Sequence, residues 1–231
     1  MAWRSSGSTN AELIANMLRY GVFNSERVAA AMTKVDRANY VLDKNAAYMD
    51  SPQRIGYDAT ISAPHMHAHA AENLLPFLHP GAKVLDVGSG SGYLTAVLFH
   101  LVDAPSAEGK GKVVGIEHID ELVQWSKENL RRDGLGKEMD EGRIIVVAGD
   151  GRQGMPNEGP YDAIHVGAAA PTMPQPLIEQ LARPGRMFIP VGTSEQKIIQ
   201  VDKDSEGNVK QQELIDVLYV PLTDKPANKS P

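Results

Sequence analysis

The chain has 231 residues, of which 42% are hydrophobic and 23% charged, the balance of an ordinary folded protein rather than a disordered or fibrous one. A formal net charge of −6 gives no general attraction for nucleic acid or acidic lipid, so neither is expected as a partner. The absence of cysteine excludes disulfides, thiolate metal ligands and thiol nucleophiles. Because the N-terminus lacks a signal-peptide core and no apolar run is long enough to cross a membrane, we expect a cytoplasmic protein.

The N-terminal part of the chain is predicted to be helical. Apolar residues recur at helical spacing over 9–20 and 25–35, and each run follows a hydroxyl residue suited to an N-cap. After a polar stretch that contains Pro52 and Gly56, Pro64 opens a third helix, which is expected to run as far as Pro76.

From Lys83 onward, apolar segments of strand length alternate with helical ones. Strands are expected at 83–88, 112–118, 143–150, 161–167 and 186–192, with helices at 91–102, 119–130 and 174–181. This pattern predicts an α/β fold with a doubly wound, mostly parallel sheet that binds ligands at the carboxyl ends of its strands. Segments 197–204 and 211–222, joined by a turn, predict a hairpin that adds antiparallel strands at one edge.

The chain shows no internal repeat or low-complexity tract, which favours a single domain over residues 1–231. Within it, we expect helices and an active-site loop in 1–80, the cofactor-binding core in 81–195, and a hairpin and tail in 196–231.

A glycine-rich turn, Asp86 to Gly92 (DVGSGSG), ends the first strand of the alternating region and opens a helix. Glycines let a ligand approach the backbone, and the helix terminus offers free N–H groups, so the turn indicates a nucleotide-type site. It does not match the dinucleotide fingerprint, because Tyr93 stands where the last glycine belongs. It does not match a P-loop either, because no Lys-Ser/Thr pair follows.

Acidic residues stand at the ends of three consecutive predicted strands. Asp86 would suit a ligand with a positive amino group, such as a sulfonium amino acid, and Glu117 would accept both hydroxyls of a ribose. Asp150, with Gly151, would contact an adenine edge. Together these residues predict S-adenosyl-L-methionine as the ligand.

Several strings resemble known proteins. DVGSGSGYLTA, GIEH and GDGR resemble the class I, Rossmann-like, S-adenosylmethionine-dependent methyltransferases with a seven-stranded sheet. YMDSPQRIGYDATISAPHMHAHA, YDAIHVGAAAP and YVPLTDK resemble one family among these, the protein-L-isoaspartate (D-aspartate) O-methyltransferases, and the similarity covers nearly the whole chain. The resemblance implies methylation of the free α-carboxylate of L-isoaspartyl residues in damaged proteins and peptides. The methyl ester then closes to a succinimide, which starts repair, and D-aspartyl residues stay open as a second substrate.

The resemblance also implies the site residues. Ser62 is expected to be the catalytic residue, with Thr60 beside it in the same loop. Cofactor contacts are implied at Ala59, Thr60, Ile61, Ser62, His67, Asp86, Gly88, Ser89, Gly90, Ser91, Gly92, Glu117, His118, Asp150, Gly151 and Thr223. The insertion at 103–112 and the tail beyond Asp224 depart from the family pattern and are expected at the surface.

A carboxylate acceptor is already ionised near neutral pH, so methyl transfer to it needs no general base. The segment HVGAAAP agrees, since nothing after His165 can take a proton. It also lacks the Asn/Asp-Pro-Pro-aromatic run of amino-directed DNA methyltransferases. His65, His67 and His69 invite a metal site, since the first and last could share a helical face, but no cysteine or HExxH glutamate stands near them, so we expect no metal.

Alternatives remain at two levels. The hydroxyl of Ser62 is expected to orient the acceptor carboxylate, but a hydroxyl two residues before Pro64 could instead cap the third helix. The protein could also be a non-catalytic adaptor that binds cofactor and isoaspartyl peptides, or a carboxyl methyltransferase for small molecules. A monomer is expected in each case.

Overall fold

The computed structural model describes residues 4–103 and 110–222. Its helices are α1 (Asn10–Arg19), α2 (Glu26–Lys34), α3 (Pro64–Leu74), α4 (Tyr93–Val102), α5 (Asp120–Arg132), α6 (Gly136–Asp140) and α7 (Gln175–Glu179). Its strands are β1 (Gln53–Gly56), β2 (Ala59–Ile61), β3 (Lys83–Val87), β4 (Lys112–Glu117), β5 (Ile144–Ala148), β6 (Tyr161–Val166), β7 (Leu181–Gly192), β8 (Gln196–Lys203) and β9 (Val209–Val217).

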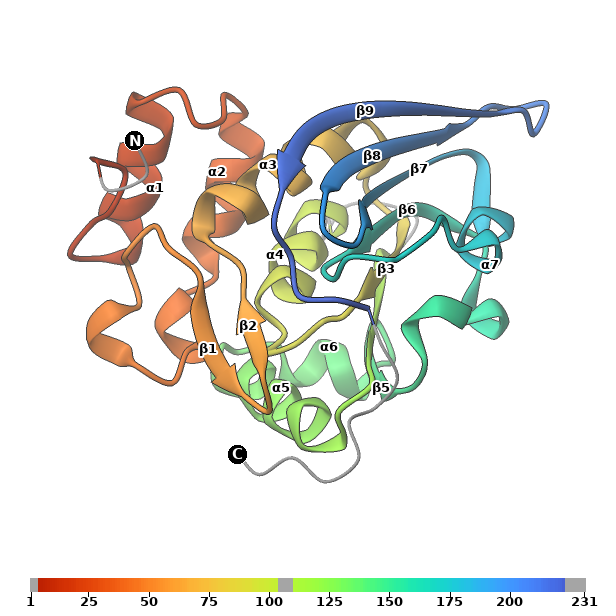
Figure 1. The fold of residues 1–231 in the computed structure, drawn as a ribbon. Coiled ribbons are helices and arrows are strands. Elements are labelled where there is room, and N and C mark those ends of the chain that lie inside the picture. Colours follow the sequence, from red (N-terminus) through yellow and green to blue (C-terminus); the bar gives the residue numbers. More distant parts are fainter. Residues whose placement is uncertain (1–3, 104–109, 223–231) are drawn as a thin grey trace.

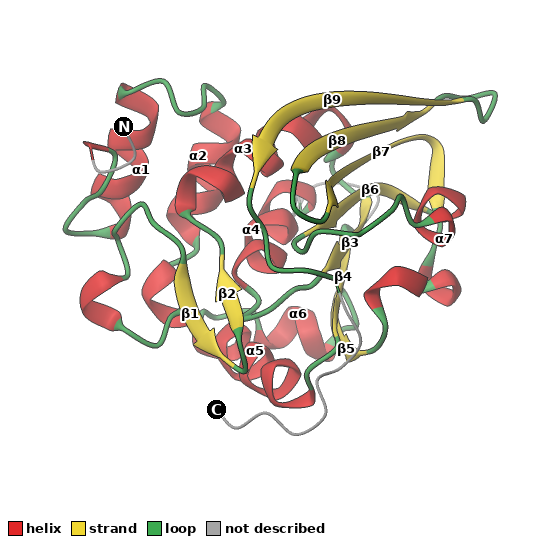
Figure 2. Ribbon diagram, viewed as in Figure 1, coloured by secondary structure: helices red, strands yellow, loops and turns green. Residues whose placement is uncertain are grey.

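The larger sheet confirms the predicted fold class (Figures 1 and 2). Its order is β5-β4-β3-β6-β7-β8-β9, with parallel pairing from β5 to β7 and antiparallel pairing of β8 and β9. The chain moves outward from β3 through β4 to β5 and then returns to the other side of β3 with β6. In an open α/β sheet such a switch point is where a ligand crevice opens at the carboxyl ends of the strands.

Two apolar cores cover the two faces of this sheet. Successive strand residues face opposite sides, so Val84 and Val113 belong to one core while Leu85 and Val114 belong to the other. Residues of α1 to α5 fill the first core, and α7 with Leu222 covers the second. Strands buried on both faces hold the glycine turn on a rigid support.

The predicted N-caps of the first two helices are confirmed. The side chain of Thr9 accepts a hydrogen bond from the N–H of Glu12, and that of Ser25 accepts one from the N–H of Val28. Each bond satisfies one of the N–H groups that a helix leaves free at its start.

Three local predictions were wrong. The polar stretch before Pro64 contains the hairpin β1–β2, and the short helix α6 lies in a segment without a predicted element. The predicted last strand ends early, at Val217, and the chain then leaves the sheet. In Figure 1 the blue segment after β9 descends past the hairpin toward the central strands.

No helix among the described residues is both long and apolar enough to span a membrane. Of the inserted segment, residues 104–109 lie outside the described residues, as does the tail beyond Asp224.

Candidate active site

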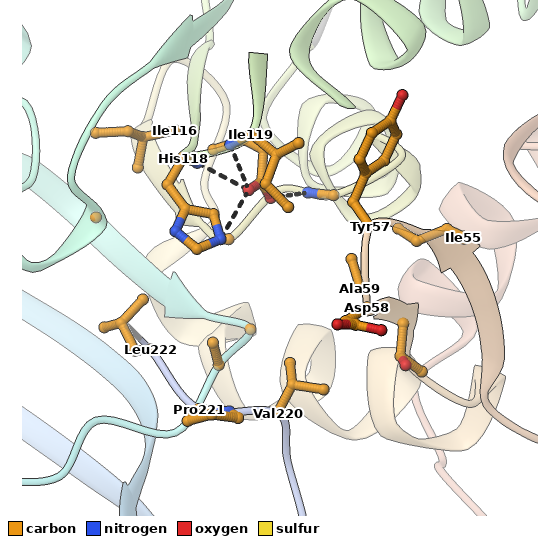
Figure 3. A pocket seen from close by; sticks show the side chains of 17 residues that line it. Ile55, Tyr57, Asp58, Ala59, Ile116, His118, Ile119, Val220, Pro221 and Leu222 are labelled. Atoms are coloured by element: carbon orange, nitrogen blue, oxygen red, sulfur yellow. Dashed lines mark hydrogen bonds and ion pairs between the residues drawn. The ribbon is translucent and has the colours of Figure 1, made fainter. Parts of the chain in front are cut away.

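A cavity of about 230 Å³ opens at the carboxyl ends of the central strands. Figure 3 shows three segments around it: the hairpin tip with Tyr57 to Ala59, residues Ile116 to Ile119 at the end of β4 and just beyond it, and Val220 to Leu222 near the C-terminus. The last segment is fixed by hydrogen bonds from the N–H of Ala169 to the carbonyl of Val220 and from the N–H of Leu222 to the carbonyl of Ala169, each 2.8 Å.

The glycine turn forms the floor of this cavity. Gly88, Gly90 and Gly92 have φ angles of +71°, +53° and +89°, in the left-handed region that favours glycine. Gly88 and Gly90 border the cavity, whereas the Cα of Gly92 packs toward Ser126 of α5. The turn therefore brings backbone, without side chains, up to a ligand.

The carboxylate of Glu117 is held in a fixed orientation. Its Oε1 accepts hydrogen bonds from the N–H groups of His118 (2.8 Å) and Ile119 (3.1 Å). Its Oε2 accepts one from the N–H of Gly90 (3.0 Å), which ties the end of β4 to the glycine turn. Glu117 is buried and borders the cavity, as the ribose contact predicted from the sequence requires.

Asp86 is buried below the turn and already has two partners. Its Oδ1 lies 2.8 Å from Nδ1 of His165, and its Oδ2 accepts a hydrogen bond of 2.6 Å from the hydroxyl of Thr95. It borders a second cavity of only about 30 Å³, between the glycine turn and the loop that carries Ser62. Asp86 thus connects β3, α4 and β6 at the switch point.

The side chain of Asp150 is occupied elsewhere. Both of its oxygens lie within 3.0 Å of the guanidinium of Arg152, and these hydrogen bonds lower the pKa of the Asp150 carboxyl. Gly151 borders the 230 Å³ cavity, whereas Asp150 does not. The structure therefore places Gly151 at the cavity, while the carboxylate of Asp150 lies outside it.

A third cavity, of about 570 Å³, lies on the far side of Ser62. Ser62 and Tyr219 border it together, and burial raises the pKa of Tyr219 to about 12. Ala63, not Ser62, is the N-cap residue of α3, and no side-chain hydrogen bond caps this helix. The capping alternative for Ser62 is therefore wrong, and its hydroxyl faces a cavity.

The two larger cavities meet at three residues. Thr60, Gly167 and Val220 border both of them, and Thr60 and Gly167 also border the small cavity. The amide of Gly167 donates a hydrogen bond of 2.7 Å to the carbonyl of Val87, which fixes the end of β6 beside that of β3. A ligand in one cavity and a ligand in the other would touch at this point.

Most predicted site residues border one of these cavities. Around the 230 Å³ cavity lie Ala59, Thr60, Gly88, Gly90, Glu117, His118 and Gly151, and around the small one lie Thr60, Ile61, Ser62, His67, Asp86, Gly88, Ser89, Gly90 and Ser91. Gly92 and Asp150 border none of the three. Thr223 lies outside the described residues.

The histidines at the start of α3 have partners in the protein. Nδ1 of His65 lies 2.8 Å from Oδ1 of Asp50, and the ring of His67 packs against that of Tyr93. Burial lowers the pKa of His67 well below its usual value, so this imidazole is neutral. The described residues hold no group of three side chains suited to a metal ion.

The sequence does not predict Tyr219, which borders the third cavity, or Arg37, which donates a hydrogen bond of 2.8 Å to the carbonyl of Ser62. Tyr219 belongs to the string YVPLTDK, which is a signal for it, although the resemblance implies only Thr223 there. Arg37 offered none, because it lies in a polar segment whose burial depends on helices that follow later in the chain.

The chain matches the family model for protein-L-isoaspartate (D-aspartate) O-methyltransferases over residues 8–227. It is 49% identical to a protein-L-isoaspartate O-methyltransferase of Caenorhabditis elegans, with 97% of each chain covered, and 47% identical to protein-L-isoaspartate O-methyltransferase 1 of Arabidopsis thaliana, with 96% and 95% covered.

A crystal structure from Plasmodium falciparum, named for the same activity and in complex with S-adenosyl-L-homocysteine, superposes with a TM-score of 0.86 at 32% identity. The superposition covers 94% of this chain and 99% of the other. The chain belongs to the protein-L-isoaspartate (D-aspartate) O-methyltransferase family.

Proposed function

We propose that this protein transfers a methyl group from S-adenosyl-L-methionine to the free α-carboxylate of L-isoaspartyl residues in damaged proteins and peptides. The observation that carries the proposal is the meeting of two cavities at Thr60, Gly167 and Val220. One cavity has the glycine turn and a fixed carboxylate expected around a nucleoside, and the other, of about 570 Å³, is bordered by Ser62.

The residues of the first cavity suit this cofactor. The glycine turn offers backbone to the amino-acid part, and Glu117 is oriented to accept ribose hydroxyls. The hydroxyl of Ser89 is buried without a hydrogen-bond partner among the described residues, so it is available to a ligand. Bound there, the cofactor supplies a methyl group on a positively charged sulfur.

Ser62 is proposed to orient the acceptor. Its hydroxyl, at the border of the third cavity beside Tyr219, would donate a hydrogen bond to one carboxylate oxygen while the other oxygen faces the methyl group. Such alignment contributes to the rate without any proton transfer. The pKa of His67, which burial lowers well below its usual value, makes this imidazole a weak base, in agreement with a reaction that needs no proton transfer.

The test is methyl transfer from labelled cofactor to an isoaspartyl peptide, with the aspartyl twin of that peptide as the control substrate. We expect labelling of the first peptide alone. Ser62→Ala should lower kcat about tenfold to a hundredfold and leave the calorimetric affinity for S-adenosyl-L-homocysteine unchanged. Ser205→Ala, in the exposed turn after β8, is the matched control and should change neither. Equal turnover in Ser62→Ala would contradict the role of Ser62.

The same assay separates the alternatives. An adaptor would bind both ligands without releasing S-adenosyl-L-homocysteine, and a small-molecule enzyme would leave both peptides unlabelled. A D-aspartyl peptide tests the second substrate.

Some expectations from the sequence remain predictions. They are a single methyltransferase domain, a monomer, a place in the cytoplasm, and the absence of nucleic-acid and membrane partners. Light scattering on the purified protein tests the monomer, and cell fractionation tests the location.

A further inference from the structure

Arg37 carries a positive charge in a place that water does not reach. It opens a short 3₁₀ helix (Arg37–Tyr40), and its exposed fraction is 0%. Nη2 donates a hydrogen bond of 2.8 Å to the carbonyl oxygen of Ser62, and Nη1 lies 3.4 Å from Nδ1 of His67. The guanidinium carbon stands 5.2 Å from the ring centre of Tyr93, and Nε has no hydrogen-bond partner among the described residues.

This charge has no carboxylate in contact with it. Among the described residues no ion pair within 4.0 Å involves Arg37. Asp50 acts on it from farther away, and the oxygens of Asp50 are bound by His65 and Ser5. Burial lowers the pKa of Arg37 to about 10, which still leaves it charged at neutral pH. Burying a cation without a carboxylate partner costs stability, so a compensating use is expected.

The position of Arg37 indicates that use. The three residues that it contacts, Ser62, His67 and Tyr93, all border the small cavity between the glycine turn and the Ser62 loop. That cavity shares Thr60 and Gly167 with both larger cavities. The guanidinium therefore lies directly behind the wall against which the acceptor carboxylate would rest.

The carboxylates around these cavities favour a positive charge close to the place of the acceptor. The carboxylates of Asp86 and Glu117 border the same cavities and would repel an anionic acceptor. The other titratable groups at the small cavity are His165, which is the partner of Asp86, the neutral His67, and Tyr93, whose pKa burial raises to about 12. In a site of low dielectric, a fixed positive charge that is hydrogen-bonded to the carbonyl of Ser62 offsets that repulsion.

We propose that Arg37 is a positioning residue that makes this site selective for an anionic acceptor. It fixes the Ser62 loop through the Ser62 carbonyl, and its charge, without contact, favours the carboxylate over a neutral group of the same shape. This inference rests on the proposed function, since it assigns the acceptor of that same reaction.

The experiment compares two peptides in the presence of S-adenosyl-L-homocysteine. One carries the isoaspartyl α-carboxylate, and the other carries the uncharged α-carboxamide in its place. In Arg37→Met, which keeps an unbranched side chain and loses the guanidinium and its charge, we expect affinity for the acid peptide to fall by at least about tenfold and affinity for the amide to stay within about twofold. Arg131→Met, an exposed arginine on α5, is the matched control for loss of one charge and should change neither.

Each result bears on the inference. Equal weakening of both peptides in Arg37→Met would show a structural role only, and an unchanged affinity for the acid would show no role; either overturns it. If Arg37→Met does not fold, Arg37→Lys takes its place, because a lysine keeps the positive charge and loses the planar guanidinium. A variant that still prefers the acid peptide over the amide, with a lower kcat, supports the inference. Loss of that preference overturns it. Wild-type protein that does not methylate the acid peptide would instead contradict the proposed function.

Discussion

Gly167 borders all three cavities, and a methyl group added at this position would crowd the backbone there. A Cβ there would lie 3.1 Å from the carbonyl oxygen of Gly88 and 3.3 Å from Cε1 of His165, at the point where the three cavities meet. Neither neighbour is the end of a flexible side chain, so the methyl group would push the end of β6 away from the glycine turn at the border of all three cavities. We expect Gly167→Ala to lower kcat/KM for an isoaspartyl peptide about tenfold to a hundredfold, measured with labelled cofactor.

The control for this prediction is Gly136→Ala in α6. A Cβ at that position would meet Cγ of Arg131 at 3.6 Å, an ordinary contact far from the cavities, so turnover should not change. If Gly167→Ala were as active as Gly136→Ala, the acceptor would not pass the point where the cavities meet.

The C-terminal end of the short helix α7 is held by a lysine from strand β8. A five-residue helix is not stable alone, and its last carbonyls need donors. The buried ammonium of Lys203 on β8 donates to the carbonyls of Ile178 (2.7 Å), Leu181 (2.9 Å) and Glu179 (3.3 Å). Its three N–H groups thus match three carbonyl oxygens.

We expect Lys203→Met to lower the free energy of unfolding by about 2–4 kcal/mol, because three buried carbonyls lose their donor. Urea unfolding followed by circular dichroism measures this. Lys197→Met, on the same strand but in an exposed pair with Glu213, is the control and should leave the transition in place. Similar midpoints for the two variants would show that water replaces the ammonium at α7.

Elements whose signals are local could be predicted from the sequence. The caps Thr9 and Ser25 and the glycine turn act within a few residues, and the buried strands follow one another as apolar runs. The fold class, and the glycine turn that forms the floor of the 230 Å³ cavity, could therefore be predicted. The hairpin β1–β2 was not, because its turn uses Tyr57 and Asp58 at φ of 53° and 58° instead of the Asn or Gly that usually marks such a turn.

Contacts between distant segments decided the rest of the site. The residues after Val217 continue a strand-like pattern, yet they leave β9 because Ala169, about fifty residues earlier, offers their backbone a partner. Asp150 was correctly placed at a strand end, but Arg152 takes its carboxylate. Neither contact, that of the chain after Val217 with Ala169 or that of Asp150 with Arg152, can be predicted from a single segment, because each depends on the folded position of both partners.

For the molecule as a whole, buried histidines link stability to pH. Burial lowers the pKa of His67, His69 and His100, and for His67 the nearby charge of Arg37 adds to the effect. Above about pH 6.5 these groups are neutral in both the folded and the unfolded chain. As the pH falls below that value, the unfolded chain binds protons that the folded chain does not, so stability present at neutral pH is lost.

We therefore expect the free energy of unfolding to fall between pH 6.5 and 5, with His67 contributing a slope that approaches about 1.4 kcal/mol per pH unit because it is fully buried. His67→Gln should flatten the dependence without abolishing it, since His69 and His100 remain. Urea titrations of the ligand-free protein at several pH values measure the slope, and His79→Gln, an exposed histidine, should leave it unchanged. An identical slope in His67→Gln would mean that the folded protein admits a proton at His67 despite burial and the adjacent guanidinium, and would contradict a neutral imidazole at this place.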